Sequence, residues 1–217
     1  MRLVLASNNA KKLIELRALL SGLALNVVAQ GELGITEADE PHHTFIENAL
    51  AKARQAARAC AGPAIADDSG LCVAALAGWP GVDSAHFAGA LTGLEGEPRE
   101  ALRRRQDQLN NDLLLQRLAN TDDRSAHFIS TLVAVRHADD PEPLVAVGRW
   151  PGQILRQPRG DGGFGYDPVM FIPDLNATVA ELDSAVKNQH SHRALAAAQL
   201  RGLMLQVWRL RPGAGPE

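Results

Sequence analysis

The chain of 217 residues has only two cysteines, Cys60 and Cys72. Two cysteines cannot form a disulfide framework, and their spacing does not match that of metal ligands. No hydrophobic run approaches the roughly 18 to 20 residues of a membrane helix, and the N-terminal run is too short for a secretory signal. The formal net charge of −3 gives no overall basic field. We therefore expect a cytoplasmic protein that binds neither nucleic acid nor membranes.

The hydrophobic pattern predicts an α/β fold. Hydrophobic residues make up 46% of the chain, which is enough for a buried core. The expected elements are strand 3–6, helix 10–20, strand 25–29, helix 44–61, strands 64–66 and 71–76, helix 98–118, strands 126–135, 143–150 and 169–172, and helix 191–209. Interleaved strands and helices indicate a mixed, twisted sheet. We expect one domain over residues 1–211 and a flexible tail over residues 212–217.

The segment SNNAKK joins the first expected strand to the first helix. Free backbone N–H groups and the positive end of the helix dipole make such a junction a candidate anion site. Ser7 and Asn9 add hydrogen-bond donors, and Lys12 adds a full charge. The Walker A pattern is absent, so this is not a P-loop. An alternative of equal weight is that Asn9 only caps a helix whose lysines are solvated.

Two consecutive carboxylates, Asp67 and Asp68, follow the expected strand 64–66. In an extended backbone they point to opposite faces, so we expect only one to face any cleft. Carboxylates at a strand end suit a hard cation such as Mg²⁺. The residues alone favour a tight turn, because Asp-Ser-Gly is common turn chemistry. The acidic loop containing Glu37, Asp39 and Glu40 is a candidate for a second metal ligand, although a solvated loop is the simpler interpretation.

A glycine-rich stretch covers residues 160–168 and formally matches G-x-G-x-x-G. A dinucleotide-binding motif must be followed by a helix, which Pro158 and Pro168 prevent here. We therefore reject a dinucleotide site. What remains is a loop that presents Phe164 or Tyr166 to a stacking base, or an ordinary glycine-rich loop.

A basic segment, residues 187–193, precedes the last helix. Lys187, His192 and Arg193 suit a phosphate or a base carbonyl, and Ser191 is a natural N-cap. A solvated basic helix end is the alternative. Together, the polar segments indicate an anionic, phosphate-bearing small molecule and a cation.

In their order and spacing, these segments resemble the inosine triphosphate pyrophosphatase (Ham1-like) family, in its bacterial XTP/dITP branch. The matching segments are ASNNAKK, TFIENALAKA, AIADDSGL, GGFGYDP and SHR, and they extend over residues 3–193. The resemblance implies an elongated two-lobed fold with a central mixed twisted sheet flanked by helices, an active cleft between the lobes, and a homodimer. It also implies Mg²⁺-dependent hydrolysis of ITP, dITP, XTP and dXTP to the nucleoside monophosphate and pyrophosphate, which keeps these nucleotides out of DNA and RNA.

The resemblance assigns roles to individual residues. It makes Asp68 the proton acceptor and a metal ligand, Glu40 the other metal ligand, and Lys52 a phosphate contact. The triphosphate loop comprises Ser7, Asn8, Asn9, Ala10, Lys11 and Lys12. The remaining substrate contacts are Ser69, then Phe164, Gly165, Tyr166 and Asp167 at the base, and Lys187, His192 and Arg193, which read the 6-keto group and complete the pocket.

One position departs from the family pattern. Relatives usually read SARYAG where this chain reads SAHFAG, so His86 replaces a cation that is always charged. If this position touches phosphate, affinity or pH dependence differs here. The residues also leave open whether Asp68 or the metal alone activates water, and whether Trp79 and Trp150 line an interface or the core.

Two other functions are compatible with the sequence. One is a related pyrophosphatase for a modified pyrimidine triphosphate, against which GGFGYDP and SHR argue. The other is a nucleotide-sensing module without turnover, against which Asp68 and Lys12 argue.

Overall fold

The computed structural model describes residues 1–94 and 96–212, and the chain divides into two compact units. Unit 1 comprises Met1–Asp68, Ser130–Arg149 and the described part of 188–217, and unit 2 comprises Ser69–Ile129 and Trp150–Lys187. Within the described residues, no helix has the length and apolar character needed to cross a membrane. Of the predicted tail, only Pro212 lies among the described residues, and it forms an isolated antiparallel β-bridge with Leu23.

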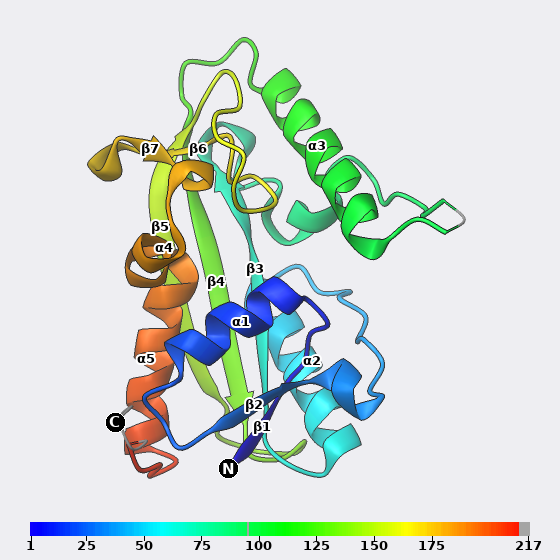
Figure 1. Cartoon of the computed structure of the whole chain (residues 1–217), viewed down its shortest axis with the longest axis vertical. Helices are drawn as coiled ribbons and strands as arrows, with labels where there is room; N and C mark the ends of the chain where they lie inside the picture. Colours follow the sequence, from blue (N-terminus) through cyan, green and yellow to red (C-terminus); the bar gives the residue numbers. More distant parts are fainter. Residues whose placement is uncertain (95, 213–217) are drawn as a thin grey trace. The chain divides into compact units, whose positions relative to one another are not determined.

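The strands form one seven-stranded sheet in the order β2-β1-β3-β4-β5-β6-β7 (Figure 1). They are β1 (Arg2–Leu5), β2 (Asn26–Ala29), β3 (Ala64–Val73), β4 (Ser125–Val135), β5 (Leu144–Ile154), β6 (Met170–Ile172) and β7 (Ala177–Thr178). The pairs β1–β2 and β1–β3 are parallel, whereas β5–β6 and β6–β7 are antiparallel. The prediction of a mixed sheet in an α/β fold is therefore confirmed.

The helices are α1 (Ala10–Leu19), α2 (Phe45–Cys60), α3 (Arg99–Arg117), α4 (Ser184–His190) and α5 (His192–Gln206). Four of them lie where the periodicity predicts a helix. The short α4 was not predicted, because its segment was taken only as an approach to the last helix.

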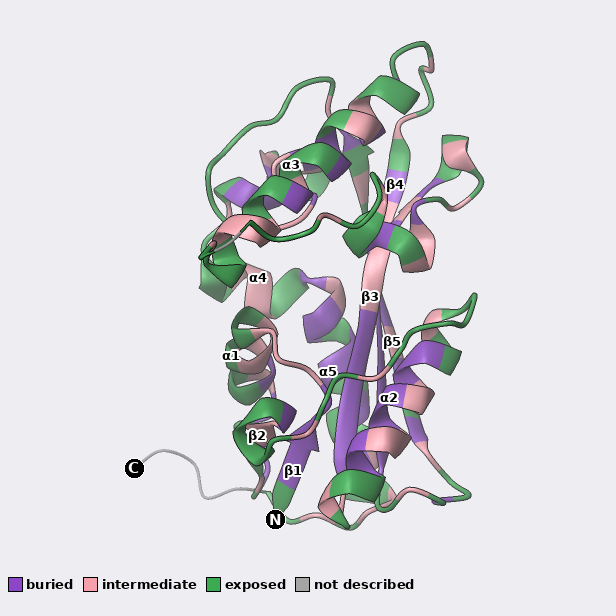
Figure 2. Cartoon of the chain, turned by 90° about the vertical axis from the view of Figure 1, so that its right-hand side faces the viewer, coloured by how far each residue is buried: buried purple, intermediate pink, exposed green. Residues whose placement is uncertain are grey.

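Two predictions for residues 67–76 are wrong. The strand expected over residues 71–76 ends at Val73, and Ala74–Leu76 form a 3-10 helix. The sequence favoured a turn over residues 67–70 between two short strands, but β3 runs through this segment without interruption. Residues 64–68 are all buried, as Figure 2 shows along β3. A strand can carry Asp67 and Asp68 in a buried position because cations from other elements pair with both, which overrides the local turn preference.

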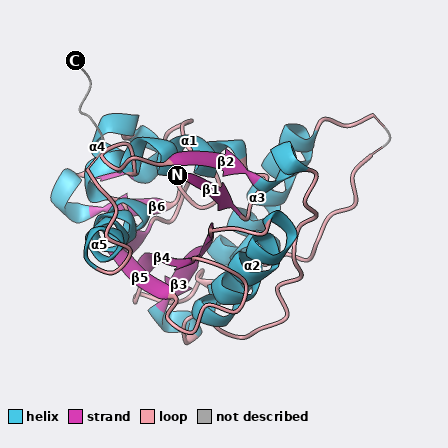
Figure 3. Cartoon of the chain, turned by 90° about the horizontal axis from the view of Figure 1, so that it is seen from below, coloured by secondary structure: helices cyan, strands magenta, loops and turns pink. Residues whose placement is uncertain are grey.

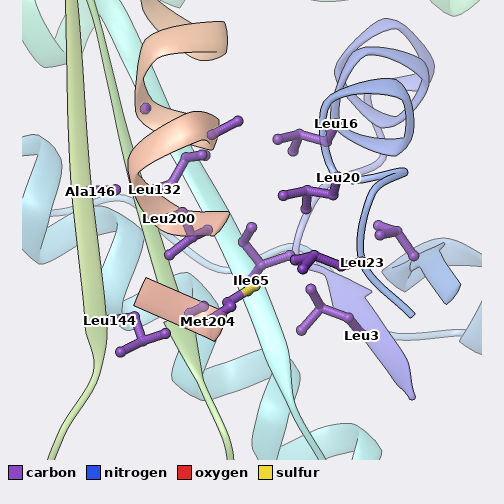
Figure 4. Packing of buried hydrophobic residues seen from close by; sticks show 14 of the residues in the cluster. Leu3, Leu16, Leu20, Leu23, Ile65, Leu132, Leu144, Ala146, Leu200 and Met204 are labelled. Carbon is purple, nitrogen blue, oxygen red and sulfur yellow. The ribbon is translucent and has the colours of Figure 1, made fainter. Parts of the chain in front are cut away.

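The core of unit 1 lies on both faces of β1, β3 and β4. On one face Leu3, Ile65 and Leu132 pack with α1 and α5, as Figure 4 shows. On the other face Val4 and Val133, together with the alanines of β3, pack against a row of alanines from α2. Accordingly, α2 and α5 lie on opposite sides of these strands (Figure 3). Successive residues of a strand therefore enter two different environments.

The helix starts agree with the local sequence. Thr44 and Glu47 match the T-x-x-E pattern of a capping box, and Thr44 caps α2 by accepting a hydrogen bond from the Glu47 N–H. The Glu47 carboxylate accepts the hydroxyl hydrogen of Thr44. Ser191 caps α5 and accepts from the Ala194 N–H at 3.1 Å.

Unit 2 has its own core, built around Leu114, Phe128, Trp150 and Tyr166. Trp150 is therefore a core residue, whereas Trp79 is 55% exposed. Trp79 lies beside a cavity of about 590 Å³ that is also lined by His86, Phe87 and Arg117.

Candidate functional site

The paired aspartates of β3 serve two different clusters in unit 1. Asp67 shares the strand face of Ile65, toward α1 and α5, and Asp68 shares the face of Ala66, toward α2. The Asp67 side chain is 0% exposed and that of Asp68 8% exposed. The expected divergence of the two carboxylates is confirmed, but both have cationic partners.

Hydrogen bonds and ion pairs from Ser130, Arg193 and Lys12 hold the carboxylate of Asp67. Ser130 Oγ donates to Oδ1 at 2.9 Å, and Arg193 Nε donates to Oδ2 at 3.0 Å. Arg193 Nη2 and Lys12 Nζ lie 2.9 and 3.0 Å from the same Oδ2. Arg193 also pairs with Glu15. Burial favours the neutral acid, but Arg193 and then Lys12 outweigh it and hold the pKa of Asp67 well below its usual range.

Around Asp68, one lysine joins two carboxylates. Lys52 Nζ donates to Asp68 Oδ1 at 2.8 Å, to Glu40 Oε1 at 2.7 Å and to the Asp67 carbonyl at 3.2 Å. Burial raises the pKa of Asp68, and Lys52 opposes this only in part. Although burial acts against the charged amine, Asp68 and Glu40 together raise the pKa of Lys52. Asp68 Oδ2 is buried and has no hydrogen-bond partner among the described residues.

The segment before α1 is organised as a helix cap. Asn9 Oδ1 accepts from the N–H groups of Lys11 and Lys12 at 3.0 and 3.3 Å, and Ser7 Oγ accepts from the Asn9 N–H at 3.1 Å. The predicted cap at Asn9 is confirmed, but the solvated lysines of that interpretation do not include Lys12. Lys11 and Ala10 are exposed, whereas Lys12 turns toward Asp67. Burial is the largest effect on Lys12 and lowers its pKa.

Next to Ser7, the amide of Asn8 has a buried oxygen. This Oδ1 has no hydrogen-bond partner among the described residues. A β-carbon on Gly31 would lie 2.5 Å from it, so the glycine gives the amide its room. Asn8 thus adds an unsatisfied polar atom to the predicted triphosphate loop.

In unit 2, the predicted base segment is a compact turn joined to α4. The Phe164 N–H donates to Asp167 Oδ2 at 3.1 Å, and Lys187 Nζ donates to the same oxygen at 2.9 Å. Lys187 Nζ also lies 5.5 Å from the centre of the Phe164 ring. The structure therefore brings together three of the predicted residues of this unit. Ser69, on β3, is half-buried.

Tyr166 occupies the core of unit 2. It is 5% exposed, and its hydroxyl donates to the Ser84 carbonyl at 2.9 Å. Burial raises the pKa of this hydroxyl well above its ordinary value. Of the two rings that the sequence offered for stacking, Phe164 is thus the more accessible.

At the start of α5, Arg193 is 3% exposed, so a solvated basic helix end does not describe it. His192 is half-buried. Of the predicted trio, His192 and Arg193 belong to unit 1 and Lys187 to unit 2. Glu37 and Asp39 are exposed.

Sequence reasoning missed Glu15, Ser130 and Gly148. Glu15 follows Lys12 by three residues, a helical spacing that places both on one face. Ser130 lies two residues before Leu132 in β4 and therefore on the same face of the strand, but no sequence pattern around it indicates a functional role. A β-carbon on Gly148 would collide with the His192 carbonyl, so this glycine lets the start of α5 approach β5 closely.

Comparison with known proteins places the chain in a class. A sequence model described as the Ham1 family matches residues 3–203. The chain belongs to the Ham1 family.

Relatives and solved structures agree with this placement. The chain is 63% identical to a dITP/XTP pyrophosphatase of Leptothrix cholodnii, over 97% of this chain and 100% of that protein. It is 54% identical to a dITP/XTP pyrophosphatase of Burkholderia pseudomallei, over 97% and 95%. The structure is similar to a HAM1 protein from Coxiella burnetii, with a TM-score of 0.84, 39% identity and coverage of 95% and 100%. For the Ham1 protein of Staphylococcus aureus these values are 0.78, 35%, 94% and 98%.

Proposed function

We propose that this chain hydrolyses non-canonical purine nucleoside triphosphates, namely ITP, dITP, XTP and dXTP, to the monophosphate and pyrophosphate. The observation that carries the proposal is that Lys12, Lys52 and Arg193 surround two buried aspartates, one of which keeps an unpaired oxygen. Relatives that are more than half identical to the chain are dITP/XTP pyrophosphatases. The reaction removes these nucleotides before they enter DNA or RNA.

The triphosphate is the ligand that the cations of unit 1 suit. Lys12 lies in the first turn of α1, where the helix dipole also favours an anion. Lys52 is fixed by two carboxylates and by the Asp67 carbonyl, so its ammonium group is already oriented. Fixed cations stabilise the charge of a phosphoryl-transfer transition state without a cost of reorganisation.

Asp68 and Glu40 fit a divalent cation, which we propose to be Mg²⁺. Among the described residues there is no group of three or more His, Cys, Asp or Glu that would enclose a metal. Mg²⁺ commonly needs only one or two carboxylates, because substrate phosphates and water complete its shell. The buried, unpaired Oδ2 of Asp68 supplies such a ligand, and Glu40 is accessible beside it. When bound, the cation neutralises phosphate oxygens and lowers the pKa of water.

Asp68 is the proposed general base. Burial raises its pKa, which makes the carboxylate a better proton acceptor than an exposed aspartate. The water oxygen forms a bond to the α-phosphorus, the bond from this phosphorus to the oxygen bridging to the β-phosphate breaks, and Asp68 accepts a proton. Lys12 and Lys52 stabilise the charge that leaves with pyrophosphate.

The proposed contacts to the base follow the family resemblance. In unit 2, Phe164 offers a ring face and Lys187 a positive charge. In unit 1, His192 is the proposed donor to a 6-keto oxygen, and Arg193, whose guanidinium pairs with Asp67 and Glu15, completes the pocket. A donor left without an acceptor by the amino group of adenine disfavours ATP, and buried unpaired donors discriminate strongly.

The decisive experiment measures hydrolysis of dITP, XTP, ATP and GTP with Mg²⁺ and scores pyrophosphate separately from orthophosphate. We expect rapid release of pyrophosphate from dITP and XTP and little turnover of ATP and GTP. Orthophosphate as the first product, or no preference among bases, overturns the proposal. Faster turnover of a modified pyrimidine triphosphate would favour the related pyrophosphatase.

The variant Asp68→Asn separates enzyme from sensor. As an enzyme, the protein should retain nucleotide binding in this variant and lose turnover. Unchanged turnover would refute the role of Asp68, and binding of dITP by the wild type without any turnover would support a sensing module.

The proposal also covers the domain organisation, the oligomeric state and the cellular location of the enzyme. We propose one family domain over residues 1–211 with a cleft between two lobes, a homodimer, and a cytoplasmic location. Exposed Trp79 and its neighbouring cavity offer a candidate subunit surface. Light scattering tests this, because a monomeric mass contradicts the dimer.

A further inference from the structure

Two polar side chains of α3 hold the backbone of one residue in the base segment. The Gly165 N–H donates to Asp107 Oδ2 at 2.8 Å, and Asn111 Nδ2 donates to the Gly165 carbonyl at 3.0 Å. Asp107 and Asn111 are four residues apart and therefore lie on one face of the helix. Both polar groups of the Gly165 backbone are thus bound by a single rigid element.

The amide of Asn111 is not explained by packing. The residue is 5% exposed, and its Oδ1 has no hydrogen-bond partner among the described residues. A buried amide oxygen without a partner costs free energy that an aliphatic side chain of similar size avoids. The hydrogen bond to Gly165 accounts for an amide at this position.

Gly165 depends on such support. Its φ of +61° is left-handed, and no atom lies within 4 Å of a β-carbon built there, so the backbone conformation rather than space calls for glycine. The residue lies in a turn outside any helix or strand. A glycine in a turn has many alternative conformations, and the bonds to Asp107 and Asn111 select one of them.

The same helix anchors the next residue indirectly. Asn110 Nδ2 donates to the carbonyls of Ser84 and Ala85 at 3.2 and 3.0 Å. The Tyr166 hydroxyl donates to the same Ser84 carbonyl at 2.9 Å. Gly165 is thus fixed by α3 directly, and Tyr166 through a segment that α3 also holds.

We propose that Asp107 and Asn111 are positioning residues that set the conformation of residues 164–167 for the nucleobase. This inference rests on the proposed function, in which that segment contacts the base. The two side chains act through the Gly165 backbone. A loosened segment must be ordered again by each substrate molecule, so binding suffers more than the chemical step.

The kinetic test compares four variants in hydrolysis of dITP. Asp107→Ala and Asn111→Leu each remove one hydrogen bond to Gly165, whereas Asp107→Asn keeps an acceptor oxygen. Asp112→Ala is the matched control, because Asp112 is exposed on the same helix. For the first two we expect KM to rise about tenfold, as loss of a hydrogen bond to a buried group implies, with kcat within about twofold of wild type. Asp107→Asn and Asp112→Ala should keep a KM near that of the wild type.

A second readout does not depend on activity. Tyr166 is the single tyrosine of the chain, so protein labelled with 3-fluorotyrosine gives one ¹⁹F resonance that reports on this segment. Without nucleotide, we expect the resonance to shift or broaden in Asp107→Ala and Asn111→Leu, and to stay in place in Asp107→Asn and Asp112→Ala.

The kinetic and NMR readouts distinguish a failure of the proposed function from a failure of the positioning role. If the wild type does not hydrolyse dITP, the proposed function fails, and the resonance alone decides whether α3 positions the segment. An unchanged resonance in both Asp107→Ala and Asn111→Leu overturns the inference. So does an unchanged KM in an active enzyme, or an equal effect in Asp112→Ala.

Discussion

The carboxylate of Asp67 can be neutralised without changing its shape, which isolates its electrostatic contribution. Asp67→Asn removes the charge that faces Lys12 and Arg193. These side chains are 17% and 3% exposed, so neither cation regains full hydration. Removing one partner of a buried ion pair costs about 3 to 5 kcal/mol. Glu15 still pairs with Arg193 in the variant, which places the expected loss near the lower end, at about 3 kcal/mol.

Urea unfolding at pH 7, followed by tryptophan fluorescence, measures this loss. With a slope of about 2 kcal/mol per molar, the midpoint falls by about 1.5 M. The matched control is Asp122→Asn, which breaks an ion pair whose side chains are 105% and 62% exposed, and no shift is expected there. A midpoint for Asp67→Asn within about 0.3 M of the wild type would refute the reasoning, since the cations would then have regained water or other partners.

Three further predictions concern other features. Gly148→Ala places a β-carbon against the His192 carbonyl and should lower the free energy of unfolding by about 1 to 3 kcal/mol. Its control, Gly202→Ala in α5, meets no neighbour and should raise the free energy of unfolding by up to about 1 kcal/mol. Equal effects of the two variants in urea unfolding would contradict this. Side-chain hydrogen bonds from Arg136 hold the pKa of Asp140 below its usual range. The stability difference between wild type and Asp140→Asn should therefore be constant above about pH 4 and shrink on further acidification. A difference that grows below about pH 4 argues against the depressed pKa. Chelation with EDTA should abolish pyrophosphate release from dITP, and added Mg²⁺ should restore it; undiminished turnover in EDTA would speak against a catalytic cation.

Most of the fold follows from local pattern. The helical spacing of Leu13, Leu16, Leu19 and Leu20 predicts α1, and the T-x-x-E cap predicts the start of α2. The turn expected after Ala66 was wrong, because Asp67 and Asp68 have partners that lie far away in the sequence. Residues 67–70 carry turn chemistry, yet tertiary ion pairs keep them extended.

The cluster around Asp68 could be predicted from the sequence, whereas the cluster around Asp67 could not. The family resemblance singled out Asp68, Lys52 and Glu40, which the structure brings together through Lys52. It gave no role to Asp67, whose partner Arg193 is 126 residues away, a pairing that no local pattern reveals.

The Arg193 ion pairs also bear on how the chain folds during synthesis. Asp67 and Glu15 precede Arg193 by 126 and 178 residues, so both acids leave the ribosome long before their cation does. Until α5 emerges, Asp67 has Lys12 but not Arg193 as a cationic partner, and the face of β1, β3 and β4 that α5 covers stays open to water. Unit 2, which ends at Lys187, can form its core earlier. The nascent chain is therefore expected to complete unit 1 last, because α5 must be synthesised before Arg193 can pair with Asp67 and before this face of β1, β3 and β4 is covered.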